Sequence, residues 1–311
     1  MPLCVFDIAA DGSATIPTDT HLNGPARYRW WHFDISDPHL ADWCETNLPA
    51  IPAGALVQPE TRPRCDTYED GLILNLRGIN LNAGQPAEEM VSIRMWVTDN
   101  VVVTARVRRV FAIDEIRQSA EADMAPPTPA AFVTALVTRL TARVQAEVMS
   151  ISKLTEFFEA DLDDGSTPIP SELPLARRRV IRLRRYLDPQ RAALNTLAAE
   201  PLIPSEDQPS LRELANRTTM AVEELDAQRE RLNAVQDDHD LDVARKQARN
   251  SFILSVGAGI FLPISFLTGL FGVNIGGMPG LNSPWAFAIL CASMALLAVL
   301  LLIVIRWKKW I

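Results

Sequence analysis

Short runs of apolar and β-branched residues, separated by polar turn residues, occupy roughly the first 120 residues. Runs of this length and composition are typical of β-strands. They predict strands at Tyr28–Ile35, Leu72–Ile79, Val91–Thr98 and Val101–Val107. Asp99-Asn100 fits the turn of a hairpin between the last two strands, and Pro38–Leu48 has the pattern of a short helix. We therefore expect residues 1–125 to form a mixed α/β domain.

From about Thr128 the apolar residues instead recur every three or four positions, which is the pattern of an α-helix. One helix should begin there, a second near Glu172, and a third at Ser210, which could cap it. No proline interrupts the third helix before Pro263, so it can continue to Phe271 with a length of about 93 Å. Its first part is strongly polar and needs partners in a bundle or an oligomer. Residues 126–250 are thus predicted to form a helical region with a long stalk.

Two uncharged, mostly apolar runs follow, Ser251–Phe271 with 21 residues and Pro284–Ile305 with 22. Each is long enough to cross a bilayer core as a helix. They predict a transmembrane hairpin over residues 251–311, with spans at 251–271 and 284–305, a periplasmic loop at 272–283 and a basic C-terminal tail. Basic residues flank the hairpin on both sides and are absent from the loop, so both termini should be cytoplasmic. These residues are Arg245, Lys246, Arg249, Arg306, Lys308 and Lys309.

The charge distribution limits the possible partners. Of the 30 Lys and Arg residues three follow the second apolar run, so residues 1–249 carry 27 basic and 38 acidic groups. This acidic balance argues against a nucleic-acid partner, which would require a basic surface. It suits a cation as cargo, because a negative field concentrates cations, although acidity also serves solubility alone.

The chain contains neither a CxxC pair nor a catalytic or nucleotide-binding motif, so we expect no enzyme activity and no required cofactor. The first residues lack the basic and apolar regions of a signal peptide. The part before the membrane hairpin is therefore predicted to be cytoplasmic, with its cysteines reduced.

Two membrane helices cannot enclose a pore by themselves, so a transporter with this layout requires a ring of subunits. The first apolar run is the better lining helix, because it carries hydroxyl and small residues and continues the polar stalk. The leucine- and valine-rich second run suits lipid contact. Counting in helical steps predicts that the following residues line the pore: Ser251, Leu254, Ala258, Leu262, Ser265, Thr268 and Gly269. Leu254 and Leu262 would form an apolar constriction.

The sequence from Phe261 to Gly280 contains the tripeptide Gly272-Val273-Asn274, followed by Ile-Gly-Gly-Met-Pro-Gly. It resembles the signature of the CorA metal-ion transporter superfamily, and the continuation is similar to that of the ZntB zinc-transporter branch. The resemblance implies a funnel-shaped homopentamer in the bacterial inner membrane, with Gly272, Val273 and Asn274 at the periplasmic mouth. It also implies transport of zinc, with uptake linked to the proton gradient.

Two alternatives to this interpretation remain open. A CorA-type magnesium, cobalt or nickel channel would share the layout, although residues 275–283 lack the acidic residue that many magnesium-type relatives carry there. A hairpin-anchored binding or sensor protein would share the hairpin without forming a pore.

Further candidates lie outside the membrane. Asp237, Asp238 and Asp240, next to His239, could form a cytoplasmic ring of metal ligands in an oligomer, or merely a solvated helix face. Because the apolar runs contain no Asp, Glu, Lys, Arg or His, this stalk segment is also the candidate for proton sensing. His39 and Cys44 are residue types that bind zinc, but their spacing matches no standard site.

An arginine-rich segment, Arg177–Arg185, is predicted to form ion pairs with neighbouring helices rather than to bind phosphate.

Overall fold

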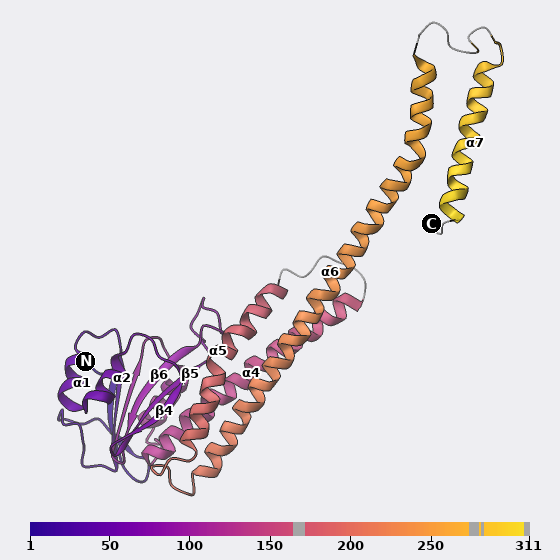
Figure 1. The fold of residues 1–311 in the computed structure, drawn as a ribbon. Helices are drawn as coiled ribbons and strands as arrows, with labels where there is room; N and C mark the ends of the chain where they lie inside the picture. Colours follow the sequence, from indigo (N-terminus) through magenta and orange to yellow (C-terminus); the bar gives the residue numbers. More distant parts are fainter. Residues whose placement is uncertain (164–171, 274–279, 281–282, 308–311) are drawn as a thin grey trace. The chain divides into compact units, whose positions relative to one another are not determined.

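The computed structural model describes residues 1–163, 172–273, 280 and 283–307 (Figure 1). The chain divides into two compact units, Met1–Gln236 and Asp237–Ile311. The three-part division predicted above stays a prediction.

A seven-stranded sheet dominates the N-terminal part of the first unit, with the strand order β2-β1-β3-β7-β6-β5-β4. Neighbouring strands are antiparallel, except that β3 and β7 are parallel. The strands are β1 (Cys4–Ile8), β2 (Ala14–Thr15), β3 (Tyr28–Asp34), β4 (Arg64–Tyr68), β5 (Gly71–Gly78), β6 (Val91–Val97) and β7 (Val101–Arg106). The four predicted strands are confirmed as β3, β5, β6 and β7, and residues 99–100 connect β6 to the antiparallel β7 as expected.

Both faces of the sheet are covered, so the central strands are buried on both sides. Ile73 and Trp96 point to a core shared with α1 (Leu40–Asn47) and α2 (Ala50–Val57). The alternate side chains, such as Leu74 and Met95, point to a core shared with α3 (Phe111–Glu121), α4 (Pro129–Asp163) and parts of α5 and α6. This double burial explains why the strands are almost continuously apolar. The short helix predicted at Pro38–Leu48 is α1.

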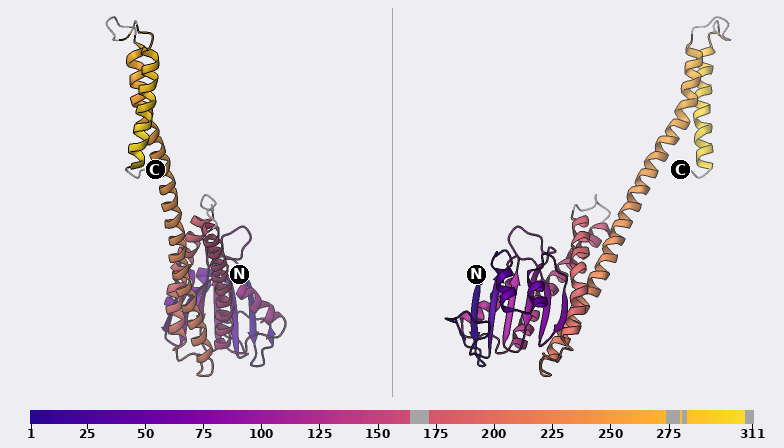
Figure 2. Two further views of the ribbon diagram at one scale, coloured as in Figure 1. Left: turned by 90° about the vertical axis from the view of Figure 1, so that its right-hand side faces the viewer. Right: turned by 60° about the vertical axis from the view of Figure 1, so that its left-hand side comes forward.

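Helices α4, α5 (Leu173–Leu197) and α6 (Gln208–Gly272) continue beyond the sheet as a three-helix arrangement (Figure 2). Val148, Leu183 and Leu225, one from each helix, are buried in a second apolar core. The three predicted helices are confirmed, and α6 runs without a break for 65 residues. The predicted cap at Ser210 is wrong, because α6 already begins at Gln208. Pro209 is tolerated in the first turn, where its missing N–H would have no partner within the helix.

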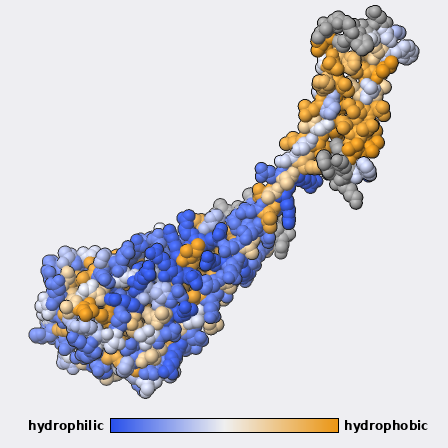
Figure 3. All heavy atoms as spheres, in the orientation of Figure 1, coloured by the Kyte–Doolittle hydropathy of each residue, from blue (hydrophilic) through white to orange (hydrophobic). Residues whose placement is uncertain are grey.

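The second unit consists of the last part of α6 and of α7 (Ala286–Trp307), which run side by side (Figures 1 and 2). Both α6 and α7 contain an apolar stretch long enough to cross a membrane. Of the residues from 237 to 307 that the structure describes, none is buried. Hydrophobic atoms therefore lie on the surface of this unit (Figure 3), which is the arrangement expected of helices whose surroundings are lipid or other subunits.

Candidate functional site

The predicted lining residues all lie on α6 and are all exposed. The set is Ser251, Leu254, Ala258, Leu262, Ser265, Thr268 and Gly269. The partly covered positions of the same helix segment are different residues: Phe252, Val256, Gly257, Ile260, Pro263, Ile264 and Leu267. These also recur every three or four positions, so they mark a second side of the helix.

The two sides of α6 are nearly opposite. At about 100° per residue, Ala258, Leu262 and Ser265 point about half a turn away from Ile260 and Leu267. Helix α7 runs beside this part of α6, and its own partly covered residues again recur at helical spacing: Ala286, Leu290, Met294, Leu297, Ala298 and Leu301. We infer that α7 covers one side of α6 and leaves the predicted lining side open.

Two hydroxyl groups on the apolar part of α6 donate their hydrogens to carbonyl groups of the same helix. Thr268 Oγ1 donates to the Ser265 carbonyl at 2.9 Å, and Ser255 Oγ donates to the Ser251 carbonyl at 2.9 Å. These bonds remove the need for another acceptor inside a membrane, where an unpaired donor would be costly. The oxygen lone pairs that remain can accept hydrogen bonds from the waters of a hydrated cation.

Glycines give the lining helix room for close neighbours. A Cβ atom added at Gly257, Gly259, Gly269 or Gly272 would meet no atom of another part of the chain within 4 Å. Small residues on a membrane helix allow a second helix to approach closely. The space around α6 is therefore compatible with helices from other subunits.

The predicted pore mouth is only partly described by the structure. Gly272 is the last residue of α6, and Val273 follows it with 46% of its surface exposed. Asn274, the residue expected to contact the cargo, lies outside the described residues. Its role stays a prediction.

The aspartates of the stalk segment are exposed on α6. Asp237, Asp238 and Asp240 have no buried surroundings within the chain, so a ring of carboxylates would require other subunits. Lys246, one helical turn from Asp242, donates a hydrogen bond to that carboxylate at 2.7 Å and lowers its pKa. The Asp242 charge is thus neutralised locally.

The structure does not bring His39 and Cys44 together as a metal site. His39 is exposed just before α1, whereas Cys44 is fully buried in the core under α1 and α2. Burial raises the pKa of the Cys44 thiol to about 12, so it is protonated at neutral pH. Across residues 1–163 and 172–307, as far as they are described, no group of three or more His, Cys, Asp or Glu side chains is arranged to hold a metal ion.

The predicted ion pairs between the arginine-rich segment of α5 and neighbouring helices are confirmed for Arg179 and Arg184, whereas Arg182 pairs with a loop. Arg179 pairs with Glu147 of α4 at 2.5 Å, and Arg184 pairs with Asp226 of α6 at 2.5 Å. Arg182 lies 3.6 Å from Glu89 in the loop before β6. These pairs join α5 to its neighbours in the first unit.

Comparison with known proteins agrees with this architecture. The model of the family described as CorA-like Mg2+ transporter protein matches residues 25–308. The chain is 32% identical to the zinc transport protein ZntB of Pectobacterium carotovorum over 91% of this chain and 88% of that protein. It is 33% identical to the divalent cation transporter CmaX of Pseudomonas aeruginosa over 92% of this chain and 89% of that protein. The solved structure of full-length CmaX superposes with a TM-score of 0.86 at 30% identity, covering 99% of this chain and 98% of that one.

An α/β unit, a long continuous helix and a C-terminal pair of apolar helices together define a membrane transporter of divalent cations, not an enzyme. The chain belongs to the CorA-like Mg2+ transporter protein family. The fold and the family expected from the sequence are thus confirmed.

Proposed function

We propose that this protein forms a homopentamer in the bacterial inner membrane and transports zinc through a central pore. The pore is lined by the open side of α6 between Ser251 and Gly272, and both chain termini are cytoplasmic. The observation that carries this proposal is that every predicted lining residue is exposed, on the side of α6 that we infer α7 leaves open. Zinc is favoured over other divalent cations because the ZntB relative is named as a zinc transport protein.

The requirement for several subunits follows from what one chain lacks. Two helices cannot surround a water-filled path, and the second unit has no buried residue in its described part. In a ring, the open side of each α6 would face the axis while α7 lies outside it. Leu254 and Leu262, with 74% and 68% of their surface exposed, would then narrow the path as apolar rings.

The chemistry of the pore mouth suits a hydrated ion. Residues 275–283 contain no acidic side chain, so the Asn274 amide oxygen and backbone carbonyls would hold the waters around the cation. A magnesium, cobalt or nickel channel of the same family is the alternative cargo assignment. Flux of each metal into liposomes that contain the purified protein distinguishes these alternatives.

Substitution at the pore mouth tests the proposal. Asn274→Ala should lower zinc flux at least tenfold without changing the oligomeric state, because it removes the proposed contact with the hydrated ion. Asn282→Ala, in the same loop, is the matched control and should keep normal flux. Undiminished zinc flux in Asn274→Ala would contradict the proposed role of Asn274 at the pore mouth. If the wild-type protein is a monomer in detergent, a hairpin-anchored binding or sensor protein would be favoured instead.

Coupling to the proton gradient would have to act outside the apolar spans, which contain no Asp, Glu, Lys, Arg or His. In a ring, Asp237, Asp238 and Asp240 would be repeated in every subunit, and their like charges would repel one another. Replacing these aspartates and His239 should therefore change the dependence of zinc flux on pH. A pH profile identical to that of the wild type would assign any coupling to the pore water.

A further inference from the structure

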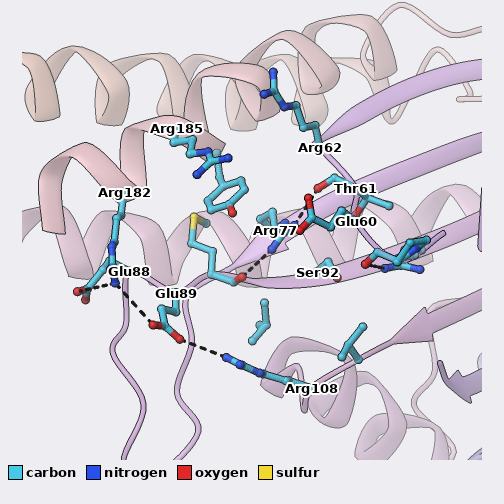
Figure 4. A pocket seen from close by; sticks show the side chains of 16 residues that line it. Glu60, Thr61, Arg62, Arg77, Glu88, Glu89, Ser92, Arg108, Arg182 and Arg185 are labelled. Atoms are coloured by element: carbon cyan, nitrogen blue, oxygen red, sulfur yellow. Dashed lines mark hydrogen bonds and ion pairs between the residues drawn. The ribbon is translucent and has the colours of Figure 1, made fainter. Parts of the chain in front are cut away.

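A polar cavity of about 700 Å³ lies in the first unit, where β5 ends and β6 begins (Figure 4). Six arginines and three glutamates line it, so its charged lining has a net charge of +3, whereas the whole chain has −8. The arginines are Arg62, Arg77, Arg94, Arg108, Arg182 and Arg185. Their concentration is unexpected in an acidic protein and points to an anion.

Two of these arginines have no carboxylate partner among the described residues. Arg94 is only 1% exposed and donates to the carbonyls of Leu56 at 2.9 Å and Pro59 at 3.2 Å. Arg77 donates to the carbonyls of Met90 at 2.9 Å and Thr61 at 2.8 Å. Burial, followed by the nearby charge of Arg77, lowers the pKa of Arg94 to about 10, and burial also lowers the pKa of Arg77. An anion bound beside them would favour the charged guanidinium groups and so raise both pKa values again.

Unpartnered polar atoms cluster at the same corner of the sheet. The Nε atoms of Arg77 and Arg94 are buried without a hydrogen-bond partner. Asn75, directly opposite Arg94 across β5 and β6, is 2% exposed, and its amide oxygen and nitrogen also lack partners. Buried polar atoms are normally satisfied, so such a concentration marks a place where a ligand or water belongs.

The rim of the cavity supplies further positive charge. Arg62 and Arg185 are exposed and have no ion-pair partner among the residues that the structure describes. The Arg77 guanidinium lies 4.3 Å from the centre of the Tyr186 ring, which orients it. On the other side, Arg108 and Arg182 share Glu89 at 3.5 and 3.6 Å, so they are partly neutralised (Figure 4). The positive side is therefore the one with Arg62, Arg77 and Arg185, where Glu60 is the nearby carboxylate.

We propose that this cavity binds a small soluble polyanion that carries several phosphate groups. Guanidinium groups match phosphate oxygens with paired hydrogen bonds, and three arginines from β5, α5 and the loop before β4 line this side of the cavity. The cavity has the size of a site for a small organic molecule, and a single phosphate would fill little of it. Arg62, Arg77 and Arg185 contact the phosphates. This site is independent of the proposed pore.

Calorimetric titration of the full chain in detergent with inorganic tripolyphosphate tests the site. Metal-free buffer at low salt prevents chelation of cations from imitating binding. The double variant Arg62→Ala, Arg185→Ala changes only exposed side chains and should raise Kd at least tenfold. The double variant Arg212→Ala, Arg229→Ala removes the same charge from exposed positions of α6 and should leave Kd unchanged. Citrate, titrated in parallel, should bind more weakly than tripolyphosphate if phosphate geometry is recognised.

Three results would overturn the proposal. The first is the absence of saturable binding to the wild type. The second is an equal loss in both double variants, which would indicate attraction by overall charge. The third is binding that appears only after the oligomer is dissociated, because an acidic segment of another copy would then occupy the cavity.

Discussion

Leu225 and Leu262 are the same residue type on the same continuous helix, yet the first is fully buried and the second is 68% exposed. Leu225 packs in the core formed by α4, α5 and α6, whereas Leu262 lies on the open side of the second unit. Both segments of α6 are helical, so helix formation does not distinguish them. The difference lies in what covers the apolar side chains of α6. In the first unit the rest of the chain covers them, and in the second unit lipid and, in our proposal, other subunits cover them.

Ion pairs show the same contrast. In the first unit, Arg29 is fully buried and donates to Asp7 through two hydrogen bonds of 2.5 and 2.7 Å, and to Asp19 through two of 2.6 and 3.3 Å. In the second unit, the Lys246–Asp242 pair is exposed. The buried network ties the loop before β3 to β1, while the exposed pair connects neighbouring turns of one helix.

The largest expected effect comes from breaking the buried network. Arg29→Met should reduce the free energy of unfolding of the first unit by about 3–5 kcal/mol, because it leaves the Asp7 carboxylate buried without its partner. Lys246→Met should have no measurable effect, because its pair is in contact with solvent. Urea unfolding of both variants in detergent measures the difference. Equal free energies of unfolding for Arg29→Met and Lys246→Met would contradict the difference between the buried and the exposed ion pair.

Leucine truncation gives a somewhat smaller effect that separates stability from transport. Leu225→Ala should cost about 2–5 kcal/mol, because it leaves a cavity in a closed core. Leu262→Ala should leave the unfolding of the first unit unchanged and raise basal ion flux, because it widens the proposed constriction. Both are checked by unfolding and liposome flux on the same preparations. A loss of stability in Leu262→Ala with unchanged flux would place Leu262 in a packing role instead.

The smallest expected effect, taken for one pH unit, arises in the first unit from a buried histidine. Burial and the adjacent Arg106 lower the pKa of His32 to about 3, and its Nε2 accepts a hydrogen bond from Arg106 at 3.2 Å. The unfolded chain therefore binds a proton that the folded chain does not between about pH 3 and 6.5. Over that window this group should lower stability by about 1.4 kcal/mol for each unit that the pH falls.

The slope of stability against pH isolates the contribution of His32. His32→Gln should have a shallower slope below pH 6.5 than the wild type, and His39→Gln, at an exposed position, should keep the wild-type slope. If the His32→Gln slope matches that of the wild type, another group controls the acid sensitivity.

Much of the fold could be predicted because its signals are local. The absence of proline over most of α6 predicted one long helix, and the charge-free runs predicted the hairpin. The strands β3, β5, β6 and β7 are rich in β-branched residues and were predicted correctly. Periodicity also selected one side of α6 as the lining side, and the residues on it are exposed in the single chain, but their role in a pore stays a prediction.

Elements stabilised by distant contacts were missed. Helix α2 contains Pro52 and Gly54, which disfavour helix, but it buries Leu56 and receives a hydrogen bond from Arg94 at its last turn. The strand β4 is polar because it lies at the sheet edge. The arginine-lined cavity was also missed, since its residues come from segments far apart in the sequence and form no motif.

The central claim, that the open side of α6 lines the ion path, is tested most directly by thiol accessibility in liposomes. Cys44 and Cys65 are buried, which raises each thiol pKa to about 12, so replacing the partly exposed Cys4 and the exposed Cys291 with serine gives a silent background. Into it are introduced Ala258→Cys and Ser265→Cys on the open side, and Ile260→Cys and Leu267→Cys on the α7 side. A charged, water-soluble thiol reagent should modify the first two and block metal flux, while leaving flux through the other two unchanged. Equal modification on both sides, or block only on the α7 side, would contradict the claim.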